Sequence, residues 1–411
     1  MSKLKELIRE LCPDGVEFMP IKDVYQRLKG TPITAAKMKE IERADGNVRI
    51  FAGGKTVIDA YEEDIPKANI TRVPAVLVQS RGVIDAVYYE KPFTFKNEMW
   101  AYTHENKTAV KYLYYVLKNN MEKFREAASG MGSLPQISLK VTEDFLIPVP
   151  PLPVQREIVR ILDNFTELTA ELTAELTARQ KQYGYYRNKL LSFENETSMQ
   201  ALGDVCDVIA GGTPSKKNSD FWDDGTIKWL GSTVCQNQKT VDSVTDYITE
   251  QGLASSSAKM MKKDTTLIAL VGATIGKVAF LPFEAAINQN IAGVYPKDTT
   301  VLDPSYVYYA CTTLYPKFLA LTQSSKLAMA NMSFVRGLQI PVPPITVQQK
   351  IAHVLDNFDA ICSDLKIGLP AEIEARQKQY EFYRDALLTY AATGKTILTD
   401  RQTDRQTDRR V

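Results

Sequence analysis

The chain has 411 residues, of which 44% are hydrophobic and 24% are charged, and its formal net charge is +1. This length favours two or more domains, and this composition is that of a globular protein, which excludes a disordered or membrane-embedded chain. Domains that bind DNA unaided usually carry a clear excess of Lys and Arg. Either this chain does not bind DNA, or partners supply much of the phosphate contact.

The sequence gives no sign of a secretion signal, a disulfide framework or a metal site. Its first residues, MSKLKELIRELCPDG, lack an apolar signal core. The cysteines are odd in number without a CxxC pair, and the two histidines have no metal-ligand spacing. We therefore expect a cytoplasmic chain with reduced cysteines that binds no metal. The cysteines are Cys12, Cys206, Cys235, Cys311 and Cys362, and the histidines are His104 and His353.

Residues 1–150 and residues 198–343 are variable segments with similar composition. Both contain short β-branched and aromatic runs between Gly, Pro, Asn and Asp, such as VPAVLVQS (residues 73–80). Such runs predict strand-rich domains of mixed α/β structure. The most apolar run, residues 265–283, is interrupted by Lys277 and two glycines. It predicts two buried strands around a turn, and it is too short and too interrupted to span a bilayer.

A helical segment follows each variable segment, over residues 151–197 and residues 344–394. IPVPPLPVQREIVRILDNF, which begins at Ile147, returns as IPVPPITVQQKIAHVLDNF, which begins at Ile340. ARQKQYGYYRNKLL also returns, as ARQKQYEFYRDALL. The prolines are helix start signals, and the apolar residues that follow recur three or four positions apart on one helical face. The first helix would span roughly 60 Å.

The two helices are expected to differ in their middle parts. The first carries ELTA three times over residues 167–178, which favours a helix, whereas Gly368-Leu369-Pro370 should break or kink the second. One more ELTA unit would add ~6 Å with ~40° of rotation, so the distance between the domains would change more than their phase. Repeat slippage without consequence is the alternative interpretation. The end of the chain, residues 395–411, contains TDRQTDRQTDRRV and is expected to be disordered.

An apolar face of this length is not stable in water, and each helix is the natural partner of the other. We predict an α+β fold in which two pseudo-symmetric mixed domains are separated by two long helices that form an antiparallel coiled coil. Core helices of unrelated domains would not explain the repeated sequence. The expected packing residues are Ile158, Ile161, Leu162, Phe165, Leu168, Leu172, Tyr183, Tyr186, Ile351, Val354, Leu355, Phe358, Ile361, Tyr380 and Tyr383.

Fragments that imitate catalytic motifs are incomplete. FAGGK (residues 51–55) is a glycine turn without the acidic residue that completes a nucleotide site. GATIGKV (residues 272–278) has too few residues between its glycines for a phosphate loop, and Val278 replaces the magnesium-binding Ser or Thr. No Ser-His-Asp or Cys-His set stands out, and the Pro-Pro pairs lack the polar and aromatic flanks of an amino-methyltransferase. We therefore expect no catalytic residues, and a self-contained methyltransferase is disfavoured.

Polar loops in both variable segments carry side chains that suit base edges and phosphates. GGTPSKK (residues 211–217) offers hydroxyls and lysines, and CQNQKT (residues 235–240) offers amides, which can pair bidentately with adenine. Each such residue alone is more often a solvated surface residue; two domains with such loops favour DNA contact. The candidates are Lys37, Lys39, Arg43, Lys55, Gln79, Ser80, Arg81, Lys96, Asn97, Thr213, Ser215, Lys216, Lys217, Trp229, Gln236, Asn237, Gln238, Lys239, Thr274, Lys277, Asn288, Asn290 and Lys326.

These features resemble the specificity subunit of type I restriction–modification systems. The resemblance rests on the repeated IPVPP, LDNF and ARQKQY stretches, on GGTPS followed by FW and WL, on GATIGKV and on the ELTA tandem. It covers nearly the whole chain except the tail. It implies two target-recognition domains that each read half of a bipartite DNA site, across a nonspecific gap set by the helices. The first domain departs from the pattern, with KGTPIT (residues 29–34) in place of GGTPS.

The resemblance also implies partners. Two modification subunits would bind S-adenosylmethionine and methylate adenine, and restriction subunits would hydrolyse ATP with Mg²⁺ and cut double-stranded DNA, so that this chain itself binds no cofactor. Such partners could clamp the duplex and supply the missing phosphate contacts. The alternative function is a protein–protein scaffold on the same repeat that binds no DNA. Binding to random duplex at several salt concentrations would distinguish the two, because only a DNA-binding complex shows a salt slope.

Overall fold

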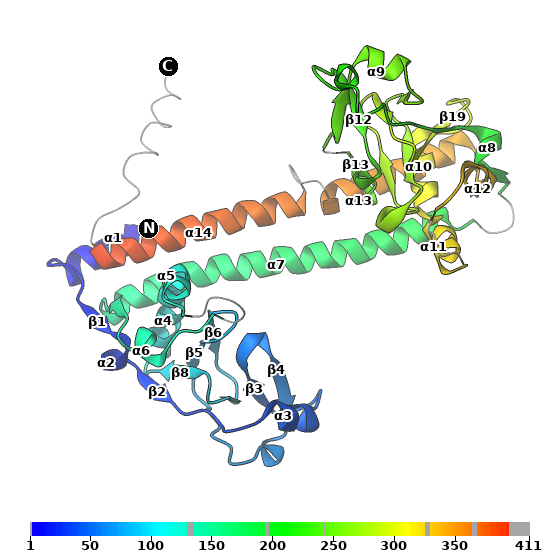
Figure 1. Cartoon of the computed structure of the whole chain (residues 1–411). Helices are drawn as coiled ribbons and strands as arrows, with labels where there is room; N and C mark the ends of the chain where they lie inside the picture. Colours follow the sequence, from blue (N-terminus) through cyan, green and yellow to red (C-terminus); the bar gives the residue numbers. More distant parts are fainter. Residues whose placement is uncertain are drawn as a thin grey trace, which may run out of the picture. The chain divides into compact units, whose positions relative to one another are not determined.

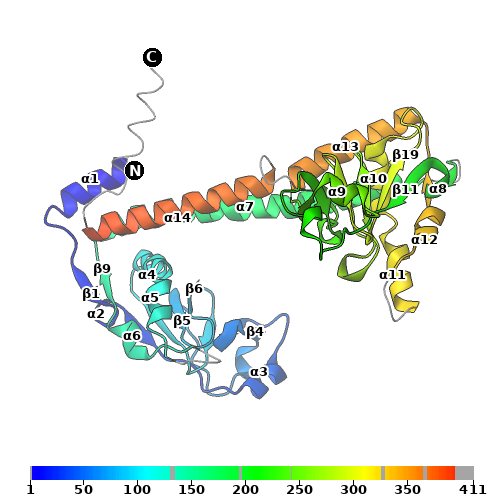
Figure 2. The ribbon, with the colours of Figure 1, turned by 45° about the horizontal axis from the view of Figure 1, so that its top comes forward.

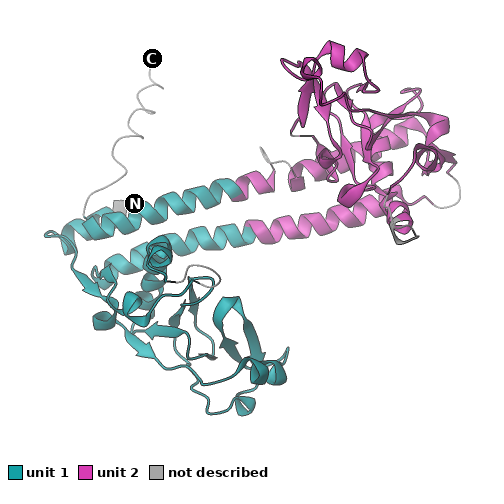
Figure 3. Cartoon of the chain, viewed as in Figure 1, with its two compact units in different colours: residues 1–171, 374–411 teal, residues 172–373 magenta. Residues whose placement is uncertain are grey.

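The computed structural model describes residues 2–129, 135–193, 197–241, 243–324, 329–363 and 368–393. The chain divides into two compact units, unit 1 with residues 1–171 and 374–411 and unit 2 with residues 172–373 (Figure 3). Each unit combines a mixed α/β domain with parts of the long helices. The C-terminal segment that we expect to be disordered and the candidate Lys326 lie outside the described residues.

Unit 1 contains sheets with the strand orders β2-β8-β5-β6, β4-β3-β7 and β1-β9 (Figure 1). Strand β3 runs parallel to β7, with Phe51 opposite Phe95. The strands are β1 (Phe18–Pro20), β2 (Gln26–Leu28), β3 (Val48–Phe51), β4 (Val57–Ala60), β5 (Ala75–Gln79), β6 (Asp85–Tyr89), β7 (Phe93–Phe95), β8 (Trp100–Thr103) and β9 (Leu146–Pro148). The helices are α1 (Ser2–Leu11), α2 (Ile21–Val24), α3 (Ala35–Ile41), α4 (Lys107–Asn119), α5 (Met121–Glu126) and α6 (Leu139–Glu143).

Unit 2 contains sheets with the strand orders β11-β19-β16-β17-β13, β14-β12-β18-β15 and β10-β20. Strand β12 runs parallel to β18, with Leu230 opposite Ile287. The strands are β10 (Met199–Ala201), β11 (Cys206–Ala210), β12 (Ile227–Leu230), β13 (Gln238–Thr240), β14 (Asp246–Ile248), β15 (Lys259–Met261), β16 (Thr266–Ala269), β17 (Val278–Phe280), β18 (Ala285–Ile287), β19 (Ile291–Pro296) and β20 (Gln339–Pro341). The helices are α8 (Leu202–Val205), α9 (Glu250–Ala254), α10 (Pro304–Thr312), α11 (Tyr315–Ser324) and α12 (Met332–Gly337).

The two domains share their connectivity, as the repeat predicts. In each, a short first strand pairs antiparallel with the last strand, β1 with β9 and β10 with β20, and a long helix follows the last strand. Each domain also has a central parallel pair, β3 with β7 and β12 with β18. The prediction that the apolar run in the second domain forms two buried strands is confirmed, because β16 and β17 pair antiparallel around a turn at Gly272–Thr274.

The long helices follow the repeated segments. Helix α7 (Leu152–Leu191) is continuous through the ELTA tandem, whereas the second copy forms α13 (Ile345–Ser363) and α14 (Leu369–Thr393). The predicted interruption is confirmed by the start of α14 at Leu369. Pro370 then lies in the first turn of α14, where a missing backbone N–H removes no intrahelical hydrogen bond.

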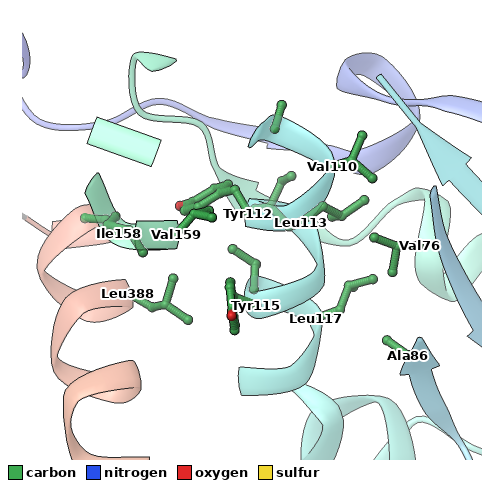
Figure 4. Packing of buried hydrophobic residues seen from close by; sticks show 14 of the residues in the cluster. Val76, Ala86, Val110, Tyr112, Leu113, Tyr115, Leu117, Ile158, Val159 and Leu388 are labelled. Carbon is green, nitrogen blue, oxygen red and sulfur yellow. The ribbon is translucent and has the colours of Figure 1, made fainter. Parts of the chain in front are cut away.

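In unit 1 the start of α7 packs against the end of α14, so the two helices run antiparallel (Figures 1 and 2). Ile158 and Leu162 share a buried cluster with Leu387 and Leu388. Phe165 stacks on Tyr383 with 5.2 Å between ring centroids. Helix α4 joins the same cluster, and its side chains lie between α7 and the sheet (Figure 4).

In unit 2 the end of α7 packs against the start of α13. Leu191 lies in one cluster with Ile351 and Leu355. The rings of Tyr183 and Tyr186 lie 6.4 and 5.6 Å from the ring of Phe358. The antiparallel pairing that we predicted from the repeat is therefore confirmed within each unit.

Three of the expected packing residues are substantially exposed: Val354 by 40%, Ile361 by 42% and Tyr186 by 42%. Tyr186 still stacks on Phe358, but Val354 and Ile361 are not part of the apolar cluster of unit 2, so the prediction is wrong for these two. At the start of α7 in unit 1, Val154 is buried beneath α1, which contributes Leu4 to the same cluster. The corresponding residue of α13, Val347, is 38% exposed. Within the described part of unit 2, no helix takes the place of α1, so this face of α13 stays open.

The neighbouring residues Leu355 and Val354 allow a matched test of this packing. Leu355 is fully buried, so Leu355→Ala should leave a cavity and lower the free energy of unfolding by roughly 2–5 kcal/mol. Val354→Ala removes methyl groups from an exposed position of the same helix, and should change it by less than about 0.5 kcal/mol. Denaturant unfolding of the two variants measures both values. Equal losses would contradict the packing described here.

Candidate nucleic-acid interface

A glycine pair allows the loop after β11 to approach the sheet closely. A Cβ atom at Gly211 would lie 1.8 Å from the backbone oxygen of Ile287, and one at Gly212 would lie 2.0 Å from Ser257 Oγ. The Gly212 N–H donates to the Ile287 carbonyl at 2.9 Å. Glycine is therefore required at both positions for the backbone to pass.

Two tryptophans hold the following residues in place. The indole N–H of Trp229 donates to the Gly212 carbonyl at 3.0 Å, and that of Trp222 donates to the Ser215 carbonyl at 3.2 Å. The two rings meet edge to face with 5.3 Å between centroids. The Lys216 ammonium lies 5.3 Å from the Trp222 ring, a cation–π arrangement. The loop thus presents exposed hydroxyl and ammonium groups on an ordered backbone.

A second polar loop precedes β13 in the same unit. Asn237 has a left-handed backbone (φ 61°), and its side-chain oxygen accepts the Val278 N–H at 3.0 Å. The Gln236 side chain donates to the Thr233 carbonyl at 2.9 Å and accepts from Lys277 at 3.3 Å. An amide and an ammonium are thereby brought together from segments that are far apart in the sequence.

A third loop, between β18 and β19, meets the glycine loop. Thr213 donates its hydroxyl proton to the side-chain oxygen of Gln289 at 2.5 Å. Gln289 is exposed and lies between the candidates Asn288 and Asn290; the sequence singles out the stretch NQN, but our residue candidates did not include Gln289 itself. The signal was present, because the stretch NQN contains three consecutive amides.

Unit 1 presents a different surface at the corresponding place. Thr31 is buried, and its hydroxyl lies 2.7 Å from that of Thr94. Lys37 pairs with Glu40 at 2.8 Å, and Lys96 pairs with Glu98 at 3.0 Å. Two of the six cationic candidates of this domain, Lys37 and Lys96, are therefore paired with neighbouring carboxylates.

The burial of the candidate residues sorts them into three groups. The exposed candidates are Lys39, Arg43, Lys55, Arg81, Asn97, Ser215, Lys216, Lys217, Gln236, Asn237 and Gln238. The partly buried candidates are Lys37, Lys96, Thr213, Lys239, Thr274, Lys277 and Asn290. The buried candidates are Gln79, Ser80, Trp229 and Asn288.

The structure corrects five of these candidates. Gln79, Ser80, Trp229 and Asn288 are at most 8% exposed, so their side chains do not form the surface that a base edge would meet. Ser80, for example, donates its hydroxyl proton to the Glu98 carbonyl at 2.5 Å. Lys239 forms an ion pair with Asp356 of α13, so its charge is already matched within the chain.

The described residues offer no metal site. Within them, no group of three or more His, Cys, Asp or Glu side chains gathers as a metal ion would require. His104 instead accepts the Asn106 N–H at 2.9 Å. Nor does any helix in the described ranges have the length and apolar character needed to cross a membrane.

The family model and the similar proteins all point to one family. The family model described as "Type I restriction modification DNA specificity domain" matches residues 13–179 and 195–375. The chain is 33% identical to the type I restriction enzyme EcoR124I/EcoR124II specificity subunit of Escherichia coli, over 95% of this chain and 98% of that protein. It is 30% identical to a putative type I restriction enzyme specificity subunit of Haemophilus influenzae, over 92% and 96%.

Solved structures share the fold at lower sequence identity. The S subunit of a type I restriction–modification system from M. genitalium superposes with a TM-score of 0.59 at 17% identity, covering 93% of this chain and 97% of that one. A chain from a structural study of complex assembly and conformational transition of the type I R-M system superposes with a TM-score of 0.53 at 17% identity, covering 93% and 98%.

Proposed function

This chain belongs to the type I restriction–modification DNA specificity family, and from this premise we propose that it reads a bipartite DNA site with one half-site per domain. In this function the chain recognises DNA and carries no catalysis of its own. It places adenine-methyltransferase and restriction subunits on the duplex. We also place this function in the cytoplasm, which suits the five free cysteines.

The observation that supports this proposal best is one framework with two different polar surfaces. Both domains have the same strand pairing at their start and end, and the same central parallel pair. Their loops differ: the second domain exposes Lys216, Lys217 and Gln236, whereas the first pairs Lys37 and Lys96 with glutamates and exposes a different set of cations. These are Lys39, Arg43, Lys55 and Arg81. A repeated framework with distinct loops suits the reading of two different half-sites.

The chemistry of the second domain fits recognition in the major groove. Glutamine and asparagine amides pair bidentately with adenine, and hydroxyl groups contact several bases. Lysines at the same surface would contact phosphates and fix the register of the protein on the duplex. Because the net charge of the chain is only +1, we assign a share of the phosphate contacts to partner subunits.

The proposed partners carry the cofactors. Modification subunits would bind S-adenosylmethionine, and restriction subunits would bind ATP and Mg²⁺. The chain reads the sequence and the partners perform the chemistry, so methylation and cleavage share one specificity. In the alternative function, a scaffold that binds no DNA, the near-neutral charge would need no compensation by partners.

Methylation mapping tests this proposal directly. A host that carries the complete system should contain methylated adenines within one bipartite sequence, and replacement of residues 198–343 by the second domain of a relative should change one half-site only. The same host with the chain deleted is the control, and it should lose methylation at these sites. Unchanged methylation after the domain replacement would overturn the proposal.

A further inference from the structure

We propose that Asp163 of α7 and Asp356 of α13 are positioning residues that set the angle at which each domain sits on its own long helix. This inference rests on the proposed function, since the angle matters for reading two half-sites at a defined gap. The two residues occupy the same place in the repeated LDNF stretch. Neither was among our candidates from the sequence.

In unit 1 the Asp163 carboxylate receives two donors from α4. The Tyr115 hydroxyl donates to Asp163 Oδ1 at 2.6 Å, and Lys111 Nζ lies 2.7 Å from Asp163 Oδ2. Burial, together with the bond to this carboxylate, raises the pKa of Tyr115, so its hydroxyl keeps the proton that it donates. Each carboxylate oxygen therefore has a donor from the domain.

In unit 2 the Asp356 carboxylate binds the equivalent tyrosine and a lysine from a different element. The Tyr309 hydroxyl donates to Asp356 Oδ1 at 2.5 Å, as Tyr115 does in the first repeat. The residue that corresponds to Lys111 is Ser305, and its hydroxyl lies 3.4 Å from both carboxylate oxygens. The ammonium comes from Lys239 of β13, which bonds to Asp356 and also donates to Ser305 Oγ at 2.6 Å.

The carboxylate and the tyrosine thus occupy equivalent positions in the two repeats, whereas the lysine comes from α4 in unit 1 and from β13 in unit 2. Lys239 lies 117 positions from Asp356 in the chain, whereas Lys111 lies 52 positions from Asp163. Both ammonium groups also lie against aromatic rings, Lys111 5.4 Å from the Tyr88 ring centroid and Lys239 5.0 Å from that of Phe280. In both domains the carboxylate therefore binds one tyrosine hydroxyl and one lysine ammonium, although the lysines come from different elements. This recurrence indicates that the pair of donors has a role in both domains.

This arrangement adds charge-assisted direction to the surrounding packing. The contacts of α4 with α7, and of α10 with α13, are largely made by apolar clusters, which resist separation but define rotation weakly. In unit 2 the buried Gln348 of α13 also accepts the Asp303 N–H at 2.9 Å and donates to the Val301 carbonyl at 3.0 Å, but these are bonds between neutral groups. Charge-assisted hydrogen bonds from two donors to one carboxylate are directional. A domain that retains them keeps one angle on its helix, and a domain without them can rotate while it stays folded.

The test moves the cation of unit 2 to its position in unit 1. The assembled complex is prepared with wild-type chain, Lys239→Met, and Lys239→Met combined with Ser305→Lys. For each, the methylation rate on a duplex with the native gap is divided by the rate on duplexes with the gap one base pair longer or shorter. We expect Lys239→Met to lower this ratio roughly tenfold, because it removes one charge-assisted hydrogen bond, and Ser305→Lys to restore it.

Three further measurements make the result decisive. Lys350→Met, which removes an exposed ammonium from the same helix, should leave the ratio unchanged. Asp356→Asn keeps an acceptor for Tyr309 but removes the charge, and it should lower the ratio as Lys239→Met does. The unfolding midpoint of each variant shows whether a lowered ratio reflects rotation of a folded domain, as we expect, or unfolding, which would overturn the inference.

Other outcomes separate this inference from its premise. A wild-type ratio near one refutes the gap reading on which the proposal depends, and the inference falls with it. A selective wild type with an unchanged ratio in Lys239→Met overturns the inference alone. If Lys239 contacts DNA instead, Lys239→Met weakens binding at every gap equally and lowers the salt slope by about one, and Ser305→Lys does not restore it.

Discussion

One further ELTA unit inserted after Ala178 is expected to lengthen the gap in the recognised DNA site by one or two base pairs. The insertion adds four residues to α7, which is continuous across this tandem, and so adds ~6 Å of helix. One base pair occupies ~3.4 Å along the duplex. The site with the original gap should then be methylated little or not at all, which is the largest change in specificity that we expect.

The rotation produced by the insertion is also compatible with DNA. Four residues turn an α-helix by one full turn and about 40°. One base pair turns the duplex by a similar angle, since one turn contains about 10–10.5 base pairs. The reading surfaces should therefore face the groove again once the gap has grown. An insertion of two residues would rotate the helix by ~200° and should abolish methylation at every gap.

Methylation mapping of a host that carries the inserted variant measures this prediction. A chain with Glu171→Gln and Thr173→Ala is the matched control, because it changes the same tandem without changing its length, and its gap should be that of the wild type. The geometric role of α7 is refuted if the inserted variant retains the original gap.

Replacement of Lys216 and Lys217 by alanine is expected to weaken DNA binding by the assembled complex roughly tenfold or more. Both lysines are exposed, and both follow the loop that Trp222 and Trp229 hold in place. Because the backbone of this loop is already held in place, phosphate binding by its ammonium groups does not have to order the loop. Each lysine–phosphate pair that the substitution removes should reduce the slope of log K against log salt by about 0.9, so the double variant should reduce it by about 1.8.

The measurement is duplex binding at several salt concentrations. The double variant Lys181→Ala and Lys189→Ala is the matched control, because it removes two exposed lysines of α7 that do not lie on a domain loop. Its slope should equal that of the wild type. A slope that falls equally in both double variants would show that general charge, and not this loop, governs binding.

The long helices were predictable because their signal is local. Apolar residues three or four positions apart define a helical face whatever the rest of the chain does, and the repetition of LDNF and ARQKQY identified the partner helix. The same holds for β16 and β17, where an apolar run around a glycine turn favours a hairpin. Within each helix and within the β16–β17 hairpin, sequence neighbours are also spatial neighbours, so a local pattern was enough; the pairing of the long helices followed from the repeat.

The sequence by itself determined the repeat, the two domains, the paired helices and the family. Only the tertiary structure decided which polar candidates face solvent: Gln79 and Gln236 are the same residue type, yet Gln79 is buried at the end of β5 and Gln236 is exposed in a loop. It also decided that Lys239 pairs with Asp356. The physical reason is that burial and ion pairing depend on contacts between residues far apart in the chain, which no local pattern records.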